Sequence, residues 1–301
     1  MPEIRRILFP VDFSRQCVLA APFIRDLAAR LGAELTVLHV ADPVSFRFSS
    51  FELNVRPLQE ILDDLTAQRR KCFFSHVLRL FPESPPRHVM LRGDPLEQIV
   101  AYTSAGKFDL VAIPEHPHGS LRTLVSESLA AKVMERVSAA VWSTEHAVGP
   151  AVPVDPHIVC ALAFHRGRSF ESANLEILAA AQSLAGALGG RLSIVHVMAA
   201  GEMEQAAGLP CLRVDPDIDG QLRRIRQTAG EAAEYHLESG DIIASLVDFV
   251  SRHQADLLVI GRSYWRAAAE DHRPHAAEIV HRAPCPVLSV YAPPVRQAAA
   301  A

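Results

Sequence analysis

The stretch LAARLGAELTVLHV, residues 27–40, returns later in the chain as LAGALGGRLSIVHV, residues 184–197. Leucine, alanine, leucine, glycine, leucine, histidine and valine are identical at matching positions. Each copy has the pattern of a helix end, a glycine that can close it in the left-handed conformation, and a buried strand. Self-similarity over this distance predicts two copies of one domain.

A second pair of segments extends the repeat. LRGDPLEQIVAYTSAGKFDLVAI, residues 91–113, aligns with LESGDIIASLVDFVSRHQADLLVI, residues 237–260, and both carry Gly-Asp before a helical pattern. The strand patterns are continuous apolar runs rich in β-branched residues, which is typical of parallel strands covered on both faces. Right-handed crossovers then predict an α/β fold with two tandem doubly wound, Rossmann-like domains, each with five strands. Pro22 predicts a late start or a kink in the first helix.

The domain boundaries follow from the repeat and from the prolines between its copies. HAVGPAVPVDP, residues 146–156, indicates a stiff, extended linker. We place a first domain at 1–146, a Pro-rich linker at 147–156, a second domain at 157–293 and a flexible tail at 294–301.

Composition narrows the class of protein. The 301 residues are 49% hydrophobic, enough for two cores, and the net charge is −4. The chain has no surplus of basic residues that would favour binding to nucleic acid or to an anionic membrane. Five scattered cysteines indicate reduced, mostly buried thiols rather than disulfides or a zinc site. No signal sequence or membrane-spanning segment is evident, so we expect a soluble cytoplasmic protein.

The chain resembles a tandem universal stress protein over nearly its whole length. The resemblance rests on ILFPVDFS at 7–14, VLHV at 37–40, IVHV at 194–197, the GDP turn at 93–95 and HRAPCPVLSVY at 281–291. It implies a five-stranded parallel sheet flanked by helices in each domain. It also implies that the two domains pair through their closing strands, near 140–144 and 286–291.

The family's ATP-binding pattern is largely missing from the first half. Members that bind ATP carry a glycine after the fourth strand, another three positions on, and a Gly-Ser or Gly-Thr pair nine residues further, where backbone N–H groups meet phosphate. The matching residues here are Pro114, Pro117, Glu127 and Ser128. Proline offers no N–H group and Glu127 adds negative charge, so only the serine fits the pattern.

The second half has lost other parts of the pattern. Gly261 is kept, but Tyr264 takes the second glycine position and Arg273-Pro274 replaces the Gly-Ser pair. The family's first strand ends in an aspartate on the adenine and ribose side, which Asp12 matches and Ala163 does not.

The first half therefore holds the candidate vestigial nucleotide pocket. No cofactor is expected, although weak binding of ATP or AMP is left open there. The pocket would comprise Pro10, Val11, Asp12, Val40, Pro114, Gly119 and Ser128.

Several polar residues have structural interpretations. His39 and His196, repeated at strand ends, are interpreted as hydrogen-bonded structure rather than general bases. Asp94 and Asp241 precede helices and are interpreted as N-caps, as are Ser14 and Ser172.

The histidine-rich loops and one aromatic cluster leave alternatives. His116 and His118 are too few to hold zinc, and the same objection applies to His272, His275 and His281, so no metal is predicted. Tyr264, Trp265 and Arg266 either pack over the second pocket or contact a flat ligand or a partner.

The leading hypothesis is a non-enzymatic, stress-response binding or scaffold protein with a degenerate ATP site and no catalytic residues. One alternative is an adenine-nucleotide sensor that uses the first pocket, and another is a metal-dependent hydrolase, for which no third ligand is found. The protein partners are unknown, and the paired domains leave further homo-oligomerisation open.

Overall fold

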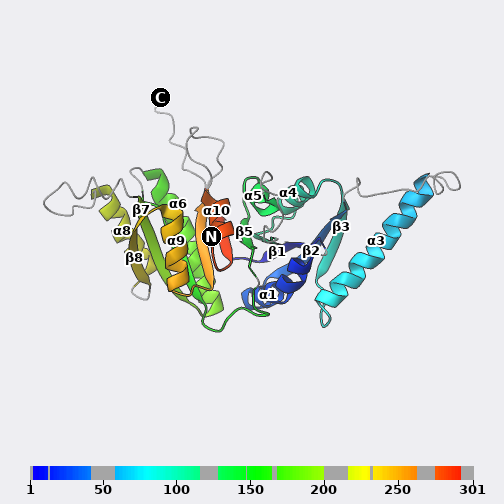
Figure 1. Cartoon of the computed structure of the whole chain (residues 1–301), viewed down its shortest axis with the longest axis horizontal. Coiled ribbons are helices and arrows are strands. Elements are labelled where there is room, and N and C mark those ends of the chain that lie inside the picture. Colours follow the sequence, from blue (N-terminus) through cyan, green and yellow to red (C-terminus); the bar gives the residue numbers. More distant parts are fainter. Residues whose placement is uncertain are drawn as a thin grey trace, which may run out of the picture.

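The structure, a computed structural model, describes residues 3–12, 14–41, 58–115, 128–146, 148–164, 168–199, 216–230, 233–262 and 275–292. Strands and helices alternate within both copies of the repeat (Figure 1). The first half contains β1 (Arg6–Pro10), α1 (Arg15–Leu31), β2 (Glu34–Ala41), α3 (Leu58–Leu80), β3 (Arg87–Arg92), α4 (Pro95–Ala105), β4 (Leu110–Pro114), α5 (Leu129–Met134) and β5 (Ala140–Thr144). The second half contains β6 (His157–Ala161), α6 (Arg168–Leu188), β7 (Arg191–Ala199), α8 (Pro216–Ala229), β8 (Glu234–Gly240), α9 (Ile242–Arg252), β9 (Leu257–Arg262), α10 (His275–Arg282) and β10 (Val287–Tyr291).

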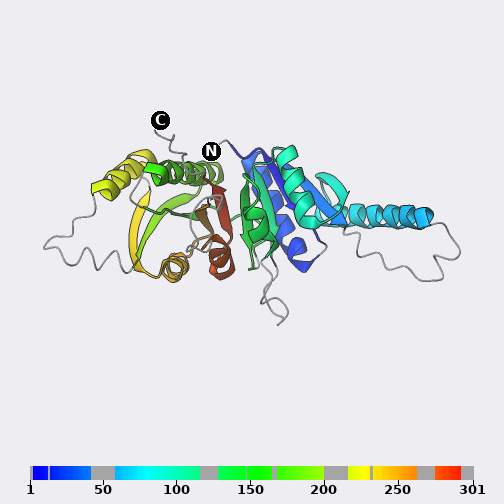
Figure 2. The same cartoon turned by 90° about the horizontal axis from the view of Figure 1, so that it is seen from above.

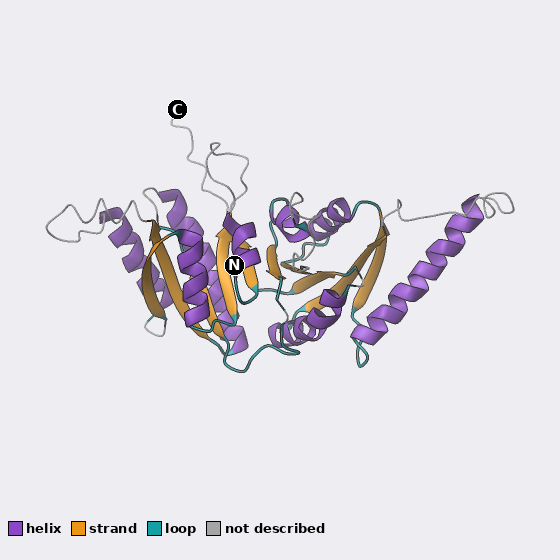
Figure 3. Cartoon of the chain, in the orientation of Figure 1, coloured by secondary structure: helices purple, strands orange, loops and turns teal. Residues whose placement is uncertain are grey.

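The strands form one continuous sheet in the order β3-β2-β1-β4-β5-β10-β9-β6-β7-β8 (Figure 3). Neighbouring strands within each half are parallel, as the apolar runs predict. At the seam, β5 and β10 are antiparallel, and Trp142 lies opposite Leu288. The two closing strands are therefore paired as the sequence predicts, and they join the two five-stranded sheets into one.

Helix ends follow the local sequence. Asp94 accepts a hydrogen bond from the Glu97 amide at 2.9 Å, and Asp241 accepts one from the Ala244 amide at 2.8 Å, so both predicted N-caps are confirmed. Ser14 caps α1 in the same way. The interpretation of Ser172 is wrong, because α6 already begins at Arg168.

The start of α1 excludes one of the two effects predicted for Pro22. This helix begins at Arg15 and continues through Pro22, so it has no late start. Gly32 ends the helix with a φ of 61°, a backbone conformation in which glycine has no steric penalty.

Helices cover both faces of the sheet (Figure 2). On one face, α1, α3, α6 and α8 pack over a core that includes Phe9, Phe23 and Trp142 together with Ile158 and Leu178. On the other face, α4, α5, α9 and α10 pack over a second core. Each core draws residues from both halves, so the halves share their buried surface.

The linker packs against α1 more closely than a free tether would. Val152 is buried, and its amide donates to the Asp26 carboxylate at 2.9 Å. Arg30 donates to the carbonyl oxygens of Val152 at 2.8 Å and Pro153 at 3.1 Å. No helix among the described residues is both long and apolar enough to cross a membrane.

Candidate functional site

The carboxyl ends of β1, β2 and β4 lie at one edge of the sheet, because these strands are parallel neighbours. Ligands of open α/β sheets bind at such an edge. The structure therefore brings together most of the predicted pocket residues: Pro10, Val11, Asp12, Val40 and Pro114. Gly119 lies outside the described residues.

Asp12 is held by the loop that follows β1. Its Oδ1 accepts from the Ser14 amide at 3.0 Å and from the Cys17 thiol at 3.2 Å, while the side chain is exposed. Burial, with a further contribution from the Asp12 charge, raises the pKa of Cys17 to about 12. The thiol is therefore protonated at neutral pH and donates to Asp12. This hydrogen bond helps to hold Asp12, the residue that matches the aspartate of the family pattern.

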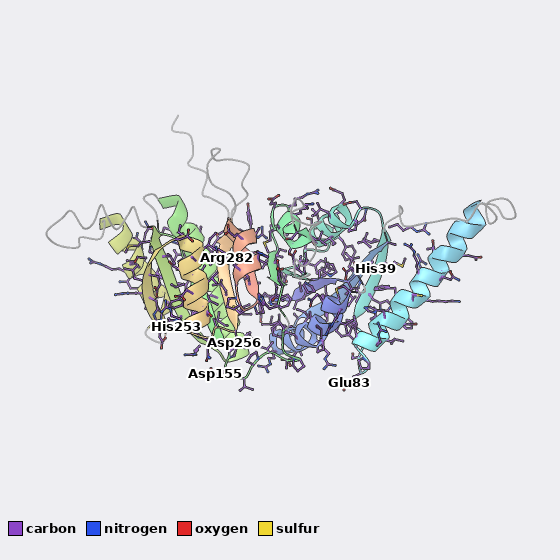
Figure 4. The ribbon with its side chains drawn as sticks, viewed as in Figure 1. His39, Glu83, Asp155, His253, Asp256 and Arg282 are labelled. Carbon is purple, nitrogen blue, oxygen red and sulfur yellow. The ribbon has the colours of Figure 1, made fainter. Side chains whose placement is uncertain are left out.

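His39 supports the same loop from β2. Its Nδ1–H donates to the Val11 carbonyl oxygen at 2.8 Å, and its ring lies 5.6 Å from that of Phe73 on α3 (Figure 4). In the second half, Nδ1 of His196 donates to the Leu162 carbonyl oxygen at 3.0 Å. Both histidines hold the loop after the first strand of their own half, which confirms the interpretation as hydrogen-bonded structure.

The start of α5 is occupied by the chain itself. Glu115, the residue after β4, is 7% exposed, and its Oε1 accepts from the Ala130 amide at 2.8 Å. Ser128 is the N-cap and accepts from the Ala131 amide at 3.0 Å. Two backbone donors at the helix start that could meet a phosphate are therefore bound to a carboxylate and a hydroxyl.

Sequence reasoning missed this role of Glu115. The sequence predicts loss of the phosphate site through missing donors and the charge of Glu127, whereas the structure shows a backbone donor at the start of α5 that is bound by Glu115. The alternation of side chains along β4 could have indicated this role. Val111 and Ile113 pack in the core beneath α5, so residue 115 faces the same side of the sheet.

The second half replaces the lost aspartate with another contact. Asn174 on α6 is 3% exposed, and its Nδ2 donates to the Ala163 carbonyl oxygen at 2.7 Å. Ala163 stands where Asp12 stands in the first half. The loop after β6 is thus fixed by a residue of the helix, and it presents no carboxylate at that position.

The comparisons with known proteins decide the family. The model of the universal stress protein family matches residues 3–143 and 169–290, one match in each half. The chain belongs to the universal stress protein family. The two matches agree with a tandem arrangement, and no curated protein matches the chain.

Solved structures support the same fold. A universal stress protein from Archaeoglobus fulgidus DSM 4304 is 16% identical with a TM-score of 0.69, covering 96% of this chain and 97% of that one. A putative universal stress protein from Pseudomonas aeruginosa UCBPP-PA14 is 17% identical with a TM-score of 0.63, covering 96% and 93%. The cytoplasmic domain of a prokaryotic cation chloride cotransporter, 12% identical, reaches a TM-score of 0.51 over 95% and 94%. At these identities the similarity shows the fold alone.

Gly261, the one family glycine kept in the second half, has a packing role. A Cβ atom at this position would collide with the side chain of Ile177 on α6. The next residue, Arg262, crosses to the first half and donates to the carbonyl oxygens of Val137 at 2.9 Å and Ala139 at 2.5 Å, and also to that of Met134. The edge of the second pocket thus serves contact between the halves.

The remaining candidate residues, which comprise family positions, loop histidines and the aromatic cluster, lie outside the described residues. They are His116, Pro117, His118, Glu127, Tyr264, Trp265, Arg266, His272, Arg273 and Pro274. Among the residues that the structure does describe, no three histidine, cysteine, aspartate or glutamate side chains form a metal-ligand group. Cys17, Cys160 and Cys285 are buried free thiols, and Cys72 is an exposed one.

Stability is expected to fall on mild acidification. Burial, with a nearby arginine in each case, lowers the pKa of His39, His76 and His157 below the ordinary value of 6.5. The unfolded chain therefore takes up these protons at higher pH than the folded chain does. The contribution to stability is complete above pH 6.5 and is lost as the pH falls through the lowered values.

Urea denaturation at pH 7.5, 6.5 and 5.5 measures this dependence, in a range above the ordinary carboxylate pKa of ~4. We expect the midpoint to fall with pH, and His39→Gln to flatten the decline. A midpoint that rises toward pH 5.5 would contradict the assignment.

Proposed function

We propose that this universal stress protein is a cytoplasmic, non-catalytic binding or scaffold protein whose ATP sites are degenerate in both halves. The observation that carries the proposal is the hydrogen bond from the Ala130 amide to Glu115. A carboxylate of the chain itself takes the place that a nucleotide phosphate would occupy at the start of α5.

Electrostatics favour exclusion of phosphate. A phosphate approaching α5 would meet the negative charge of Glu115 in a poorly solvated place, because this side chain is 7% exposed. Two unit charges at 4 Å repel by about 4 kcal/mol at an intermediate dielectric constant. That repulsion offsets much of the binding free energy that a millimolar to micromolar ligand gains.

The second half supports the proposal independently. Asn174 holds the loop after β6, and Arg262 is engaged with backbone carbonyl groups of the first half. Asn174 binds Ala163, the residue at the family's aspartate position, and Arg262 follows the family glycine Gly261, so both side chains serve structure beside the family's ligand positions. The two halves share one sheet and two cores, which suits a protein that binds partners.

An adenine-nucleotide sensor is the second candidate function. The observation that favours it is the exposed Asp12 carboxylate, which the loop after β1 holds at the edge of the sheet. A direct hydrogen bond from a ligand to this charged group is worth about 1.5 to 3 kcal/mol.

Calorimetric titration with ATP and Mg²⁺ tests both candidates. We expect wild-type binding weaker than ~100 μM, equivalent to about −5.5 kcal/mol, and no phosphate release. Glu115→Gln removes the charge but keeps an acceptor for Ala130, and it should strengthen binding at least about tenfold, since the repulsion above exceeds 1.4 kcal/mol. Glu83→Gln, an exposed site at the opposite edge (Figure 4), is the matched control and should bind as the wild type does.

Three results would change these conclusions. Micromolar ATP binding by the wild type overturns the degenerate site, and a weakening by Asp12→Ala then identifies the sensor. Phosphate release would contradict the absence of catalysis. If neither the wild type nor Glu115→Gln binds ATP, Glu115 is not what blocks the site.

A further inference from the structure

A hollow lies between α1 and α6, over the seam of the two halves and away from the nucleotide edge. Its outer part has a volume of about 170 Å³. A smaller inner space of about 20 Å³ continues beneath the linker. Four side chains line both spaces, so the two spaces are neighbours: Ile4, Leu31, Leu184 and Leu288. We name the two spaces together the α1–α6 cleft.

Small residues on α6 create the outer part. Ala180, Ser183 and Ala187 share one face of the helix by their spacing of three and four residues, and all three line the cleft. Ala180 is buried at the floor, whereas Ser183 and Ala187 are exposed at the mouth. The cleft is therefore open to solvent at one end and apolar inside.

The inner end contains a buried donor. Trp142 lines the inner space, is 1% exposed and stacks on Phe23 with ring centroids 5.5 Å apart. Among the residues that the structure describes, its indole Nε1–H has no hydrogen-bond partner. An unpaired buried donor costs about 1–3 kcal/mol, so an acceptor that reached it would gain a favourable contact.

The charged side chains of the described residues that line the α1–α6 cleft are two carboxylates, and each already has a partner. Glu3 stands at the mouth and forms an ion pair with Arg5 at 3.1 Å. Asp256 borders the inner space, and its Oδ2 accepts from the His157 amide at 2.8 Å. Two carboxylates disfavour an anion, and the apolar wall between them disfavours any ion.

We propose that the α1–α6 cleft binds a small, uncharged, apolar molecule with one hydrogen-bond acceptor, which reaches the indole N–H of Trp142. The size follows from the volume, because an apolar cavity of about 150 Å³ holds benzene. A single ring with a short carbonyl-bearing substituent fits the outer space and extends toward the inner one. This site is separate from the nucleotide edge and does not depend on the function proposed above.

The test uses the full chain with Trp265→Phe, which leaves Trp142 as the only tryptophan of the two. Acetophenone and benzene are titrated into ¹⁵N-labelled protein while the indole N–H resonance is followed. Acetophenone should bind with a Kd near or below ~1 mM and move the resonance downfield, since its carbonyl accepts the hydrogen bond. Benzene should bind without that downfield shift.

Variants at the mouth locate the site. Ser183→Leu and Ala187→Leu fill exposed positions of the cleft and should weaken acetophenone binding at least tenfold. Gly186→Leu adds the same side chain on α6 where a Cβ meets nothing within 4 Å, and it should leave binding unchanged. An unmoved indole resonance, equal shifts with benzene, or undiminished binding in both filled variants would overturn the proposal.

Discussion

Arg262→Met is expected to lower the free energy of unfolding by about 2–5 kcal/mol, because it leaves several partly buried acceptors without a donor. The guanidinium donates to the carbonyl oxygens of Val137 and Ala139 and to that of Met134, all at the end of α5 and before β5. Its Nε also donates to the Ser289 hydroxyl at 3.2 Å. Methionine keeps the apolar stem, so the loss reports the polar contacts between the halves. Urea denaturation measures it.

Arg282→Met is the matched control. Arg282, labelled in Figure 4, pairs with Glu278 one helical turn away, and both side chains are exposed. Such a pair contributes at most about 0.5 kcal/mol. Equal losses in the two variants would show that Arg262 is not the contact that joins the halves.

Much of the fold could be predicted because its signals are local. The apolar runs, the glycine after α1 and the Gly-Asp turns each fix an element within a few residues. The repeat then supplies the topology, since equivalent elements must lie in equivalent places. The pairing of β5 with β10 was also within reach, because apolar closing strands favour a partner.

The packing of the linker was not predictable in the same way. Its prolines indicate an extended chain, but an extended conformation does not indicate which residues the linker contacts. The burial of Val152 depends on Asp26 and Arg30, more than 120 residues earlier, and on the space between α1 and α6.

The candidate site was predictable at the strand ends and less so around them. Asp12 follows β1, His39 lies near the end of β2 and Ser128 precedes α5, so their positions at one edge could be expected. Glu115 and Asn174 act on groups of another element, 15 and 11 residues away along the chain, at the start of α5 and after β6. Gly261 has the family pattern, yet the structure gives it a neighbour, Ile177, that the pattern cannot show.

Trp142→Ala is expected to lower the free energy of unfolding by about 3–5 kcal/mol, the usual cost of truncating a fully buried tryptophan. Trp142 is 1% exposed, stacks on Phe23 and lies opposite Leu288 across the seam. The truncation therefore opens a cavity in a core that both halves share. Chemical denaturation followed by circular dichroism measures the loss. Phe74→Ala, at a position 45% exposed on α3, is the control and should cost about 1 kcal/mol or less.

Trp142→Phe separates the ring from its N–H group. Phenylalanine keeps the stacking on Phe23 but removes an indole donor that has no acceptor within the described part of the chain. The lost contact area destabilises the folded state, whereas removal of an unpaired buried donor stabilises it by about 1–3 kcal/mol. The two effects oppose each other, so this variant should lose less than half of what Trp142→Ala loses. Equal losses would mean that the N–H group has a partner in solution, such as a bound water in the inner space of the α1–α6 cleft.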